Sequence, residues 1–267
     1  MNASRAPWLR PLVALTVSAV FFVPLYFALV NVFKPGREIS VRPAAVPIPP
    51  TLDNIERLLG RSDRLFWASL TNSIVVTAVS VVILTVFSAM LGHYLARSRS
   101  RWVGAATVVL LAGLMIPPQA ILLPIVHVMQ ALHLMSTLQG LILLNIGYYV
   151  PFGVFVFSGF MRQIPRELEG AAAIDGASRF QTFWRVVFPL LRPASASVMI
   201  FLTPLVILGP SRGTTITTGI YRAIGYYQAD FGQIFALMFL ATLPVLIFYL
   251  AMRRHFIKGL TGGATKG

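Results

Sequence analysis

The chain has 267 residues, of which 57% are hydrophobic and only 11% are charged, and it contains no cysteine. This composition excludes an ordinary soluble domain, disulfide bonds and thiolate metal sites, and it predicts an all-α, polytopic membrane protein. The net charge of +14 would suit nucleic acid, but the Lys and Arg residues cluster at the ends of apolar runs, so we expect contact with membrane lipid and none with nucleic acid.

Six apolar windows are predicted to cross the membrane as helices of about 20 residues each. They are residues 11–33, 66–96, 102–123, 138–160, 193–208 and 231–252. The first window follows Arg5 and Arg10 as a secretory signal would, but its length and the lack of a small-residue cleavage pattern predict a retained anchor. The fifth window is interrupted by Pro204 and, at about 1.5 Å per residue, is too short for about 30 Å of hydrocarbon.

The distribution of basic residues predicts which segments face the cytoplasm. Most of the 22 Lys and Arg residues are inside in one orientation, whose cytoplasmic segments are residues 1–10, 97–101, 161–192 and 253–267. Residues 34–65 and 209–230 then lie outside. Residues 34–65 contain the proline-rich stretch VRPAAVPIPP and an amphipathic run, which together predict a small external cap.

A short helix is predicted near the start of the long cytoplasmic loop. Pro165 suits a first turn, and Glu167 and Glu169 follow where the helix dipole favours negative charge. Residues 170–173 are all small, and Gly176 can adopt the left-handed conformation that ends a helix. The helix therefore has a nearly bare face that suits close approach by another surface, although an interfacial amphipathic loop without a partner would show the same pattern.

A second helix is predicted directly after the first one. Ser178 and Gln181 form a capping-box pattern at its start. Four apolar residues recur at i, i+3, i+4 and i+7 and so share one face, namely Phe180, Phe183, Trp184 and Val187. Pro189 is expected to end this helix, because proline lacks the backbone donor.

The stretch PRELEGAAAIDGASRFQTFWRVVFPLLRP (165–193) resembles the EAA loop of bacterial ABC importer permeases, and Ile174 to Ala177 resemble the form found in carbohydrate importers. Three further stretches resemble the second permease subunit of maltose-type systems: TNSIVVT (71–77), PFGVFVFSGFMRQIPRELE (151–169) and KGLTGGATKG (258–267). The resemblance therefore extends over nearly the whole chain.

The resemblance implies a type I ABC importer permease fold in the bacterial inner membrane, with both termini cytoplasmic and a cytoplasmic coupling helix. It further implies a homologous permease that completes the pore, two cytoplasmic ATPase subunits that bind ATP and Mg, and an external sugar-binding protein. The residues expected to couple to the ATPase are Glu167, Glu169, Gly170, Ala171, Ala172, Ile174, Asp175, Gly176 and Phe180. The alternatives are a permease for a polyol or glycerol phosphate, an ATP-independent carrier and a membrane-embedded enzyme.

The sequence departs from the family pattern at two places. Gly170 occupies the position where the family usually has Glu, and Glu169 is the substitute for the expected acidic contact. The fifth window lacks several residues that the family carries, and we hypothesise that residues are missing between about Ile200 and Thr203. A continuous chain of ordinary geometry through these positions would count against that hypothesis.

Other motifs narrow the chemistry that this chain can perform. It contains no phosphate loop of the type GxxxxGK[ST], so it needs a separate ATPase and is expected to bind no cofactor itself. The predicted spans contain no Asp, Glu, Lys or Arg, which argues against an ion-coupled carrier. The four histidines are scattered, and no metal site is expected. The polar candidates for a sugar path are Asn72, Gln119, Asn145, Tyr148 and Tyr149.

Overall fold

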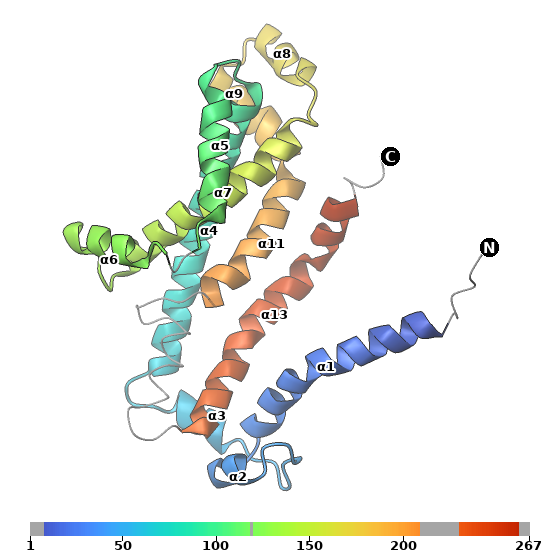
Figure 1. Cartoon of the computed structure of the whole chain (residues 1–267), viewed down its shortest axis with the longest axis vertical. Helices are drawn as coiled ribbons and strands as arrows, with labels where there is room; N and C mark the ends of the chain where they lie inside the picture. The colour runs from blue at the N-terminus through green and yellow to red at the C-terminus, as the bar shows by residue number, and fades with distance from the viewer. Residues whose placement is uncertain (1–7, 118–119, 209–229, 262–267) are drawn as a thin grey trace. The chain divides into compact units, whose positions relative to one another are not determined.

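The computed structural model describes residues 8–117, 120–208 and 230–261, which form helices and connecting turns without any strand (Figure 1). The chain divides into two compact parts. The first part contains the described residues of 1–70 and 218–244, and the second contains those of 71–217 and 245–267. Two long helices, α4 (Leu65–Arg97) and α13 (Phe231–Thr261), contribute residues to both parts.

The first part holds the helices α1 (Leu9–Val32), α2 (Gly36–Val41) and α3 (Asp53–Leu59), together with the beginnings of α4 and α13. Most large apolar side chains of α1 are exposed, as expected for a helix that faces lipid. The small core of this part consists of Leu58, Phe66, Ala236 and Leu237, which come from α3, α4 and α13. Helix α3 therefore lies where α4 and α13 begin.

Lys34, just after α1, is a fully buried lysine whose ammonium group is held by oxygen atoms alone. Its Nζ donates to the Asn31 side chain at 3.2 Å and to the carbonyls of Arg42 and Pro43 at 2.7 and 3.0 Å. Burial lowers the pKa of Lys34, and the nearby Glu38 carboxylate partly opposes that shift. These bonds hold the end of α2 and the proline-rich stretch against the end of α1.

The second part holds the helices that carry the candidate site. After α4 come α5 (Trp102–Met115), α6 (Leu122–Ala131) and α7 (Leu138–Met161), and then α8 (Glu167–Ile174), α9 (Arg179–Thr182), the π-helical turn η1 (Phe183–Val187), α10 (Phe188–Leu190) and α11 (Arg192–Leu208). Its core joins buried residues of α4, α7, η1 and α11. Helices α4 and α7 approach closely, because a Cβ on Gly153 would collide with Ser88 and a Cβ on Gly92 would lie 2.9 Å from that of Phe157.

Four of the predicted windows are confirmed as long apolar helices. The helices long and apolar enough to cross a membrane are Pro11–Val32, Leu65–Arg97, Leu138–Met161 and Phe231–Ala251. Their bounds follow the predicted windows at 11–33, 66–96, 138–160 and 231–252 closely. The last helix continues to Thr261, into the segment that the sequence assigned to a cytoplasmic tail.

The third predicted window, residues 102–123, is wrong as a single helix. Helix α5 ends at Met115 after 14 residues, or about 21 Å, and α6 begins only at Leu122. Pro117 and Pro118 explain the break, because each lacks a backbone donor and each restricts the residue before it to extended conformations. Ile116 has the extended conformation that Pro117 imposes, with ψ at 116°.

The fifth predicted window forms the helix α11, which runs through Ile200 and Thr203 without a break. It has 17 residues and lies next to the helical run Arg179–Leu190, from which the run Arg192–Thr203 is bent by 69°. Taken as one span, this bent pair raises the number of candidate spans among the described residues from four to five. The count of six spans stays a prediction, and the unbroken helix counts against the hypothesis that residues are missing between about Ile200 and Thr203. The predicted loop 209–230 lies almost wholly outside the described residues.

Candidate coupling surface

Helix α8 forms and ends as the sequence predicts. Glu167 and Glu169 lie in its first turn, where the helix dipole favours acidic side chains. Gly176 follows with a φ of +81°, the left-handed conformation that glycine adopts without strain. The backbone N–H of Ala177 turns back to the carbonyl of Ala172 at 2.9 Å, which satisfies one of the last carbonyls of the helix. The eight-residue helix is thus fixed at both ends by local sequence.

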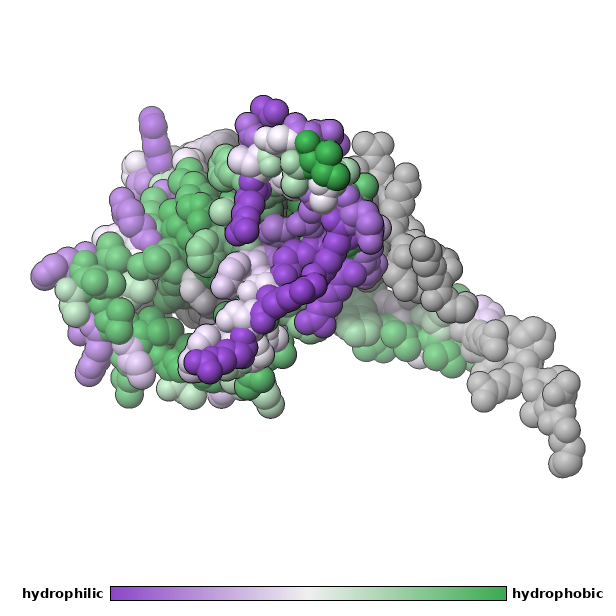
Figure 2. All heavy atoms as spheres, turned by 90° about the horizontal axis from the view of Figure 1, so that it is seen from above, coloured by the Kyte–Doolittle hydropathy of each residue, from purple (hydrophilic) through white to green (hydrophobic). Residues whose placement is uncertain are grey.

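The outward side of α8 and α9 presents apolar side chains to the surroundings. Ile174 is 88% exposed and Phe180 is 66% exposed, and Leu168 is exposed as well. A Cβ added to Gly170 would meet no atom within 4 Å, so the small-residue face is open. Figure 2 looks onto the end of the molecule that carries α8 and shows hydrophilic residues gathered there. Leu168, Ile174 and Phe180 are thus large apolar side chains exposed at this largely hydrophilic end.

The inward side of α8 is attached to the end of α4 through Glu169. Its carboxylate accepts a hydrogen bond from Arg97 Nε at 2.6 Å and lies 3.1 Å from His93 Nε2. Arg97 also donates from Nη2 to the carbonyl of Ile164 at 2.8 Å, just before α8. In return, Arg166 reaches the carbonyl of Ala96 at 3.4 Å. We call Glu169, Arg97 and His93 the α8–α4 clamp.

The clamp lies beside a cavity of about 600 Å³ between α4, α8 and α9. Burial tends to raise the pKa of Glu169, but the hydrogen bonds from His93 and Arg97 and the charge of Arg97 outweigh it and lower that pKa below its ordinary value. The carboxylate is therefore ionised at neutral pH and pairs with the Arg97 guanidinium. Charge-assisted hydrogen bonds of this kind are the strong ones, so α8 has a defined position on α4.

The second helix of the loop begins with the predicted capping box. Gln181 N–H donates to Ser178 Oγ at 3.3 Å and Ser178 N–H donates to Gln181 Oε1 at 2.9 Å. Phe183 and Val187 are buried in the core, as the apolar face predicts, and Trp184 is half-buried. Phe180 differs, because it is mostly exposed and its ring lies edge to face with that of Trp184 at 6.1 Å.

The expectation that Pro189 ends this helix is wrong. The π-helical turn η1 precedes it, and the Phe188 N–H bonds to the carbonyl of Phe183, five residues back. Helix α10 then continues through Pro189 to Leu190. A wider turn changes which carbonyls need a donor, so the missing N–H of proline is tolerated here. The bend to α11 follows at Leu191.

Comparison with known proteins identifies the family of this chain. Residues 87–261 match the family described as "Binding-protein-dependent transport system inner membrane component". The chain belongs to this family. It is accordingly a membrane permease subunit of an ABC importer, and not the subunit that hydrolyses ATP.

Two relatives match the permease along nearly its whole length. The multiple sugar-binding transport system permease protein MsmG of Streptococcus mutans is 32% identical over 95% of each chain. The melibiose/raffinose/stachyose import permease protein MelC of Bacillus subtilis is 29% identical over the full length of both. These matches cover all the helices described above.

Solved structures share the fold of the permease. One chain of a bacterial ABC transporter involved in the import of the acidic polysaccharide alginate superposes with a TM-score of 0.79 over 96% of this chain and 99% of that one, at 19% identity. A second structure shows a bacterial alginate ABC transporter in complex with a periplasmic protein that carries an alginate pentasaccharide. It superposes with a TM-score of 0.66 over 92% of both chains, at 16% identity. The all-helical permease fold expected from the sequence is thereby confirmed.

The polar residues predicted for a sugar path fall on two helices of the permease. Asn145, Tyr148 and Tyr149 lie within about one turn of α7, and the two tyrosine rings pack edge to face at 5.0 Å. Asn145 is buried, and its Nδ2 has no partner among the described residues. Asn72 is half-buried on α4, and Gln119 lies outside the described residues. Their role in a path stays a prediction.

Sequence reasoning missed the two partners of Glu169. In the sequence, Arg97 contributes only to the basic cytoplasmic segment 97–101, and His93 is one of four scattered histidines. His93 and Arg97 lie on one face of α4 because they are four positions apart. Nothing in the local sequence shows that Glu169, 72 positions after Arg97, packs against that face. Within the described part of the chain, no group of three or more His, Cys, Asp or Glu residues could hold a metal ion.

Proposed function

We propose that this permease forms half of the membrane pore of an ATP-driven carbohydrate importer. The relatives named for sugar transport, in two organisms and over the full length, support this substrate class. The other half of the pore would be a homologous permease, and two cytoplasmic ATPase subunits would bind ATP and Mg. An external sugar-binding protein would deliver the solute, and the alginate transporter in complex with a periplasmic protein that carries a pentasaccharide supports such a partner.

The observation that carries the coupling proposal is that α8 is exposed on one side and clamped on the other. Its open face, with Ile174 and Phe180 beside the small residues Gly170, Ala171 and Ala172, would dock on the ATPase. Glu167, Asp175 and Gly176 would lie at the edges of that contact. Closure of the two ATPase subunits would displace α8, and the Glu169–Arg97 bond would carry the displacement to α4.

A pair of exposed isoleucines tests this coupling surface. Ile174 on α8 and Ile48 before α3 are 88% and 82% exposed, so either can be replaced by Asp with little effect on the chain's own packing. We expect Ile174→Asp to lose the ATPase during purification of the whole importer and to lose ATP-driven uptake, whereas Ile48→Asp keeps the ATPase. Retention of the ATPase with normal uptake in Ile174→Asp would refute the proposed surface.

The carbohydrate proposal is tested with the whole importer in vesicles that enclose ATP. We expect uptake of a mono- or oligosaccharide from a panel that also contains a polyol and glycerol phosphate. Uptake of only the polyol or the glycerol phosphate would show that this solute, and not a sugar, is the substrate. Uptake without ATP would support a secondary carrier, and a chemically altered product would support an enzyme.

The orientation follows from the positive-inside rule and has its own test. We propose that both termini and the 97–101 turn are cytoplasmic and that Ile48 is external. Because the chain has no cysteine, Arg99→Cys and Ile48→Cys introduce single reactive thiols. In right-side-out vesicles, a membrane-impermeant maleimide should label Cys at position 48 and spare Cys at position 99. The reverse pattern would overturn the orientation.

The solute path is proposed to pass the polar residues Asn145, Tyr148 and Tyr149 of α7, with Asn72 of α4 and Gln119 as further contacts. Aromatic faces and amide groups suit sugars, because one packs on C–H groups and the other bonds hydroxyls. Asn145→Leu should raise the KM for uptake while ATPase retention is unchanged. An unchanged KM would remove Asn145 from the path.

A further inference from the structure

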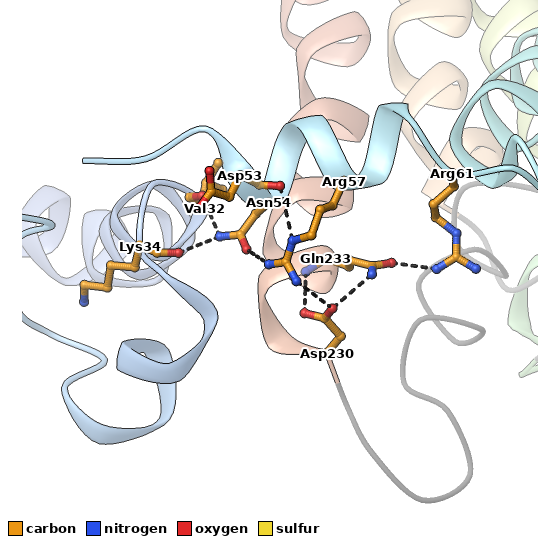
Figure 3. A network of polar contacts seen from close by, with 8 residues as sticks. All are labelled: Val32, Lys34, Asp53, Asn54, Arg57, Arg61, Asp230 and Gln233. Carbon is orange, nitrogen blue, oxygen red and sulfur yellow. Dashed lines mark hydrogen bonds and ion pairs between the residues drawn. The ribbon is translucent and has the colours of Figure 1, made fainter. Parts of the chain in front are cut away.

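Asn54 of α3 is a fully buried amide with three hydrogen bonds, two of which join α3 to the end of α1. Its Nδ2 donates to the carbonyls of Val32 and Lys34 at 2.9 and 2.7 Å. Its Oδ1 accepts from Arg57 Nη2, one turn further along α3, at 2.6 Å. Figure 3 shows Asn54 at the centre of these contacts. Both amide hydrogens and the oxygen are therefore committed, and the two bonds from Nδ2 fix the position of α3 relative to the end of α1.

Arg57 and Arg61 extend the network from α3 to the start of α13 (Figure 3). Arg57 Nη1 lies 3.7 Å from the Asp230 carboxylate, and Arg61 Nη1 donates to Gln233 Oε1 at 2.7 Å. Asp230 in turn accepts from the backbone N–H and from Nε2 of Gln233, at 3.1 and 2.9 Å. Asp230 thus caps the first turn of α13 while it contacts α3.

The same network reaches the start of α4. Arg61 makes two bonds to the Asp63 carboxylate, from Nε to Oδ1 at 3.0 Å and from Nη2 to Oδ2 at 2.7 Å. Asp63 Oδ1 also accepts from the backbone N–H of Leu65, the first residue of α4, at 3.1 Å. Polar contacts therefore join α3 to α1 and α13, and those of Arg61 and Asp63, which follow α3, reach the start of α4.

The contact between α3 and α13 leaves no free space. A Cβ on Gly232 would collide with Asn54 Oδ1, so only glycine allows α13 to approach the amide this closely. Leu58 of α3 packs with Phe66, Ala236 and Leu237 on the other side. A helix of seven residues has little stability alone, so its position depends on these contacts.

From this network we infer that α3 is a brace that makes the adjoining ends of α1, α4 and α13 move as one body during transport, with Asn54 as the positioning residue. The inference rests on the proposed function in one respect, that the permease alternates between two states. It does not depend on α8, on the identity of the ATPase contact or on the solute. A binding protein that pressed on α3 would consequently displace three spans together.

The test measures a distance within this body in the complete importer, reconstituted in lipid. Leu29 of α1 and Met238 of α13 are partly exposed, and cysteines at these positions can carry spin labels because the chain has no other cysteine. We expect one narrow distance distribution that is the same without nucleotide and with ATP bound. A shift of that distance between the two states would overturn the inference.

Asn54→Ala should broaden the distribution and make it depend on nucleotide, and uptake should fall severalfold. Glu56→Gln, on the exposed side of the same helix, is the matched control and should behave as wild type. If the Ala variant does not assemble, Asn54→Ser keeps a hydroxyl that can donate one bond, and it should broaden the distribution to a lesser degree. A distribution as narrow as wild type in an assembled Asn54 variant would show that Asn54 does not position the body.

Discussion

Two polar assemblies join helices in this permease, one around Asn54 and one around Glu169, and their central side chains differ in charge and in burial. The Asn54 side chain is neutral and fully buried, whereas the side chain of Glu169 is charged and 21% exposed. A buried amide that loses a partner keeps the full cost of desolvation, but a carboxylate close to water can be hydrated instead. The first assembly is therefore suited to a contact that stays formed, and the second to a contact that can rearrange when the helices move.

The largest expected effect is that of removing the buried amide. Asn54→Ala leaves two carbonyls and one guanidinium N–H without their partner, which should lower the free energy of unfolding by about 3 kcal/mol. Chemical denaturation of the purified permease complex measures this loss. The exposed Glu56→Gln substitution should cost less than about 0.5 kcal/mol. A loss in Asn54→Ala no larger than that of this control would contradict the difference between the two assemblies.

Breaking the α8–α4 clamp should have the second largest effect. Arg97→Ala removes the bonds to Glu169 and to the Ile164 carbonyl, at a cost of about 2 kcal/mol, and should uncouple ATP hydrolysis from uptake. Arg97→Lys keeps the charge and should restore part of the uptake. The neighbouring, exposed Arg99→Ala is the control and should leave the ratio of uptake to hydrolysis unchanged. A normal ratio in Arg97→Ala would exclude the clamp from coupling.

A double-mutant cycle probes the close approach between α13 and Asn54. Gly232→Ala alone should destabilise the permease by about 1 to 2 kcal/mol, because the new Cβ collides with Asn54 Oδ1. In Asn54→Ala/Gly232→Ala this collision is absent, so the double variant should be no less stable than Asn54→Ala. The free energies of unfolding of the four proteins decide the matter. Additive losses would mean that Gly232 is required for a reason other than Asn54.

The smallest effect is expected from acid. Burial tends to raise the pKa of Glu169, but its bonds to His93 and Arg97 have the larger effect and bring that pKa below the ordinary value of 4.5. The pairing of Glu169 therefore stabilises the permease at pH values above 4.5, and this stabilisation is lost only as the pH falls below 4.5. Arg61 lowers the pKa of Asp63 to about 2, from 3.8, so that pairing is lost only between these two values. With His93 replaced by Gln, so that no imidazole lies beside the carboxylate, the stability difference between the Glu169 protein and its Glu169→Gln variant should stay constant from about pH 8 to about pH 5. A difference that changes within this range would show that another group controls the clamp.

The sequence predicts those features that local chemistry decides. Helices α4 and α7 follow their apolar windows, and the ends of α8 and the start of α9 follow from Gly176 and from Ser178 with Gln181. Proline was the least dependable signal. The Pro117-Pro118 pair divides an apolar window that looked continuous in the sequence. Pro189, in contrast, lies within a helix, where the preceding π-helical turn makes its missing N–H tolerable.

The two polar assemblies could not be predicted from the sequence, because each joins residues far apart in it. The residues Glu169 and Arg97 are 72 positions apart, and Arg61 and Gln233 are 172 apart. Asn54 has no local signature either, since asparagine in a short external helix would ordinarily be exposed. Only the packing of α3 against α1 and α13 gives these side chains their partners.

The bend of 69° between the runs Arg179–Leu190 and Arg192–Thr203 determines how motion passes along the chain. Helical runs are stiff along their axes, so a displacement of the first run would be passed to the second run at the bend, in a different direction. A displacement along the first run has its smaller component along α11 and its larger component across it. A push from the loop, as the proposed coupling requires, would therefore tilt α11 more than it would shift the helix along its axis.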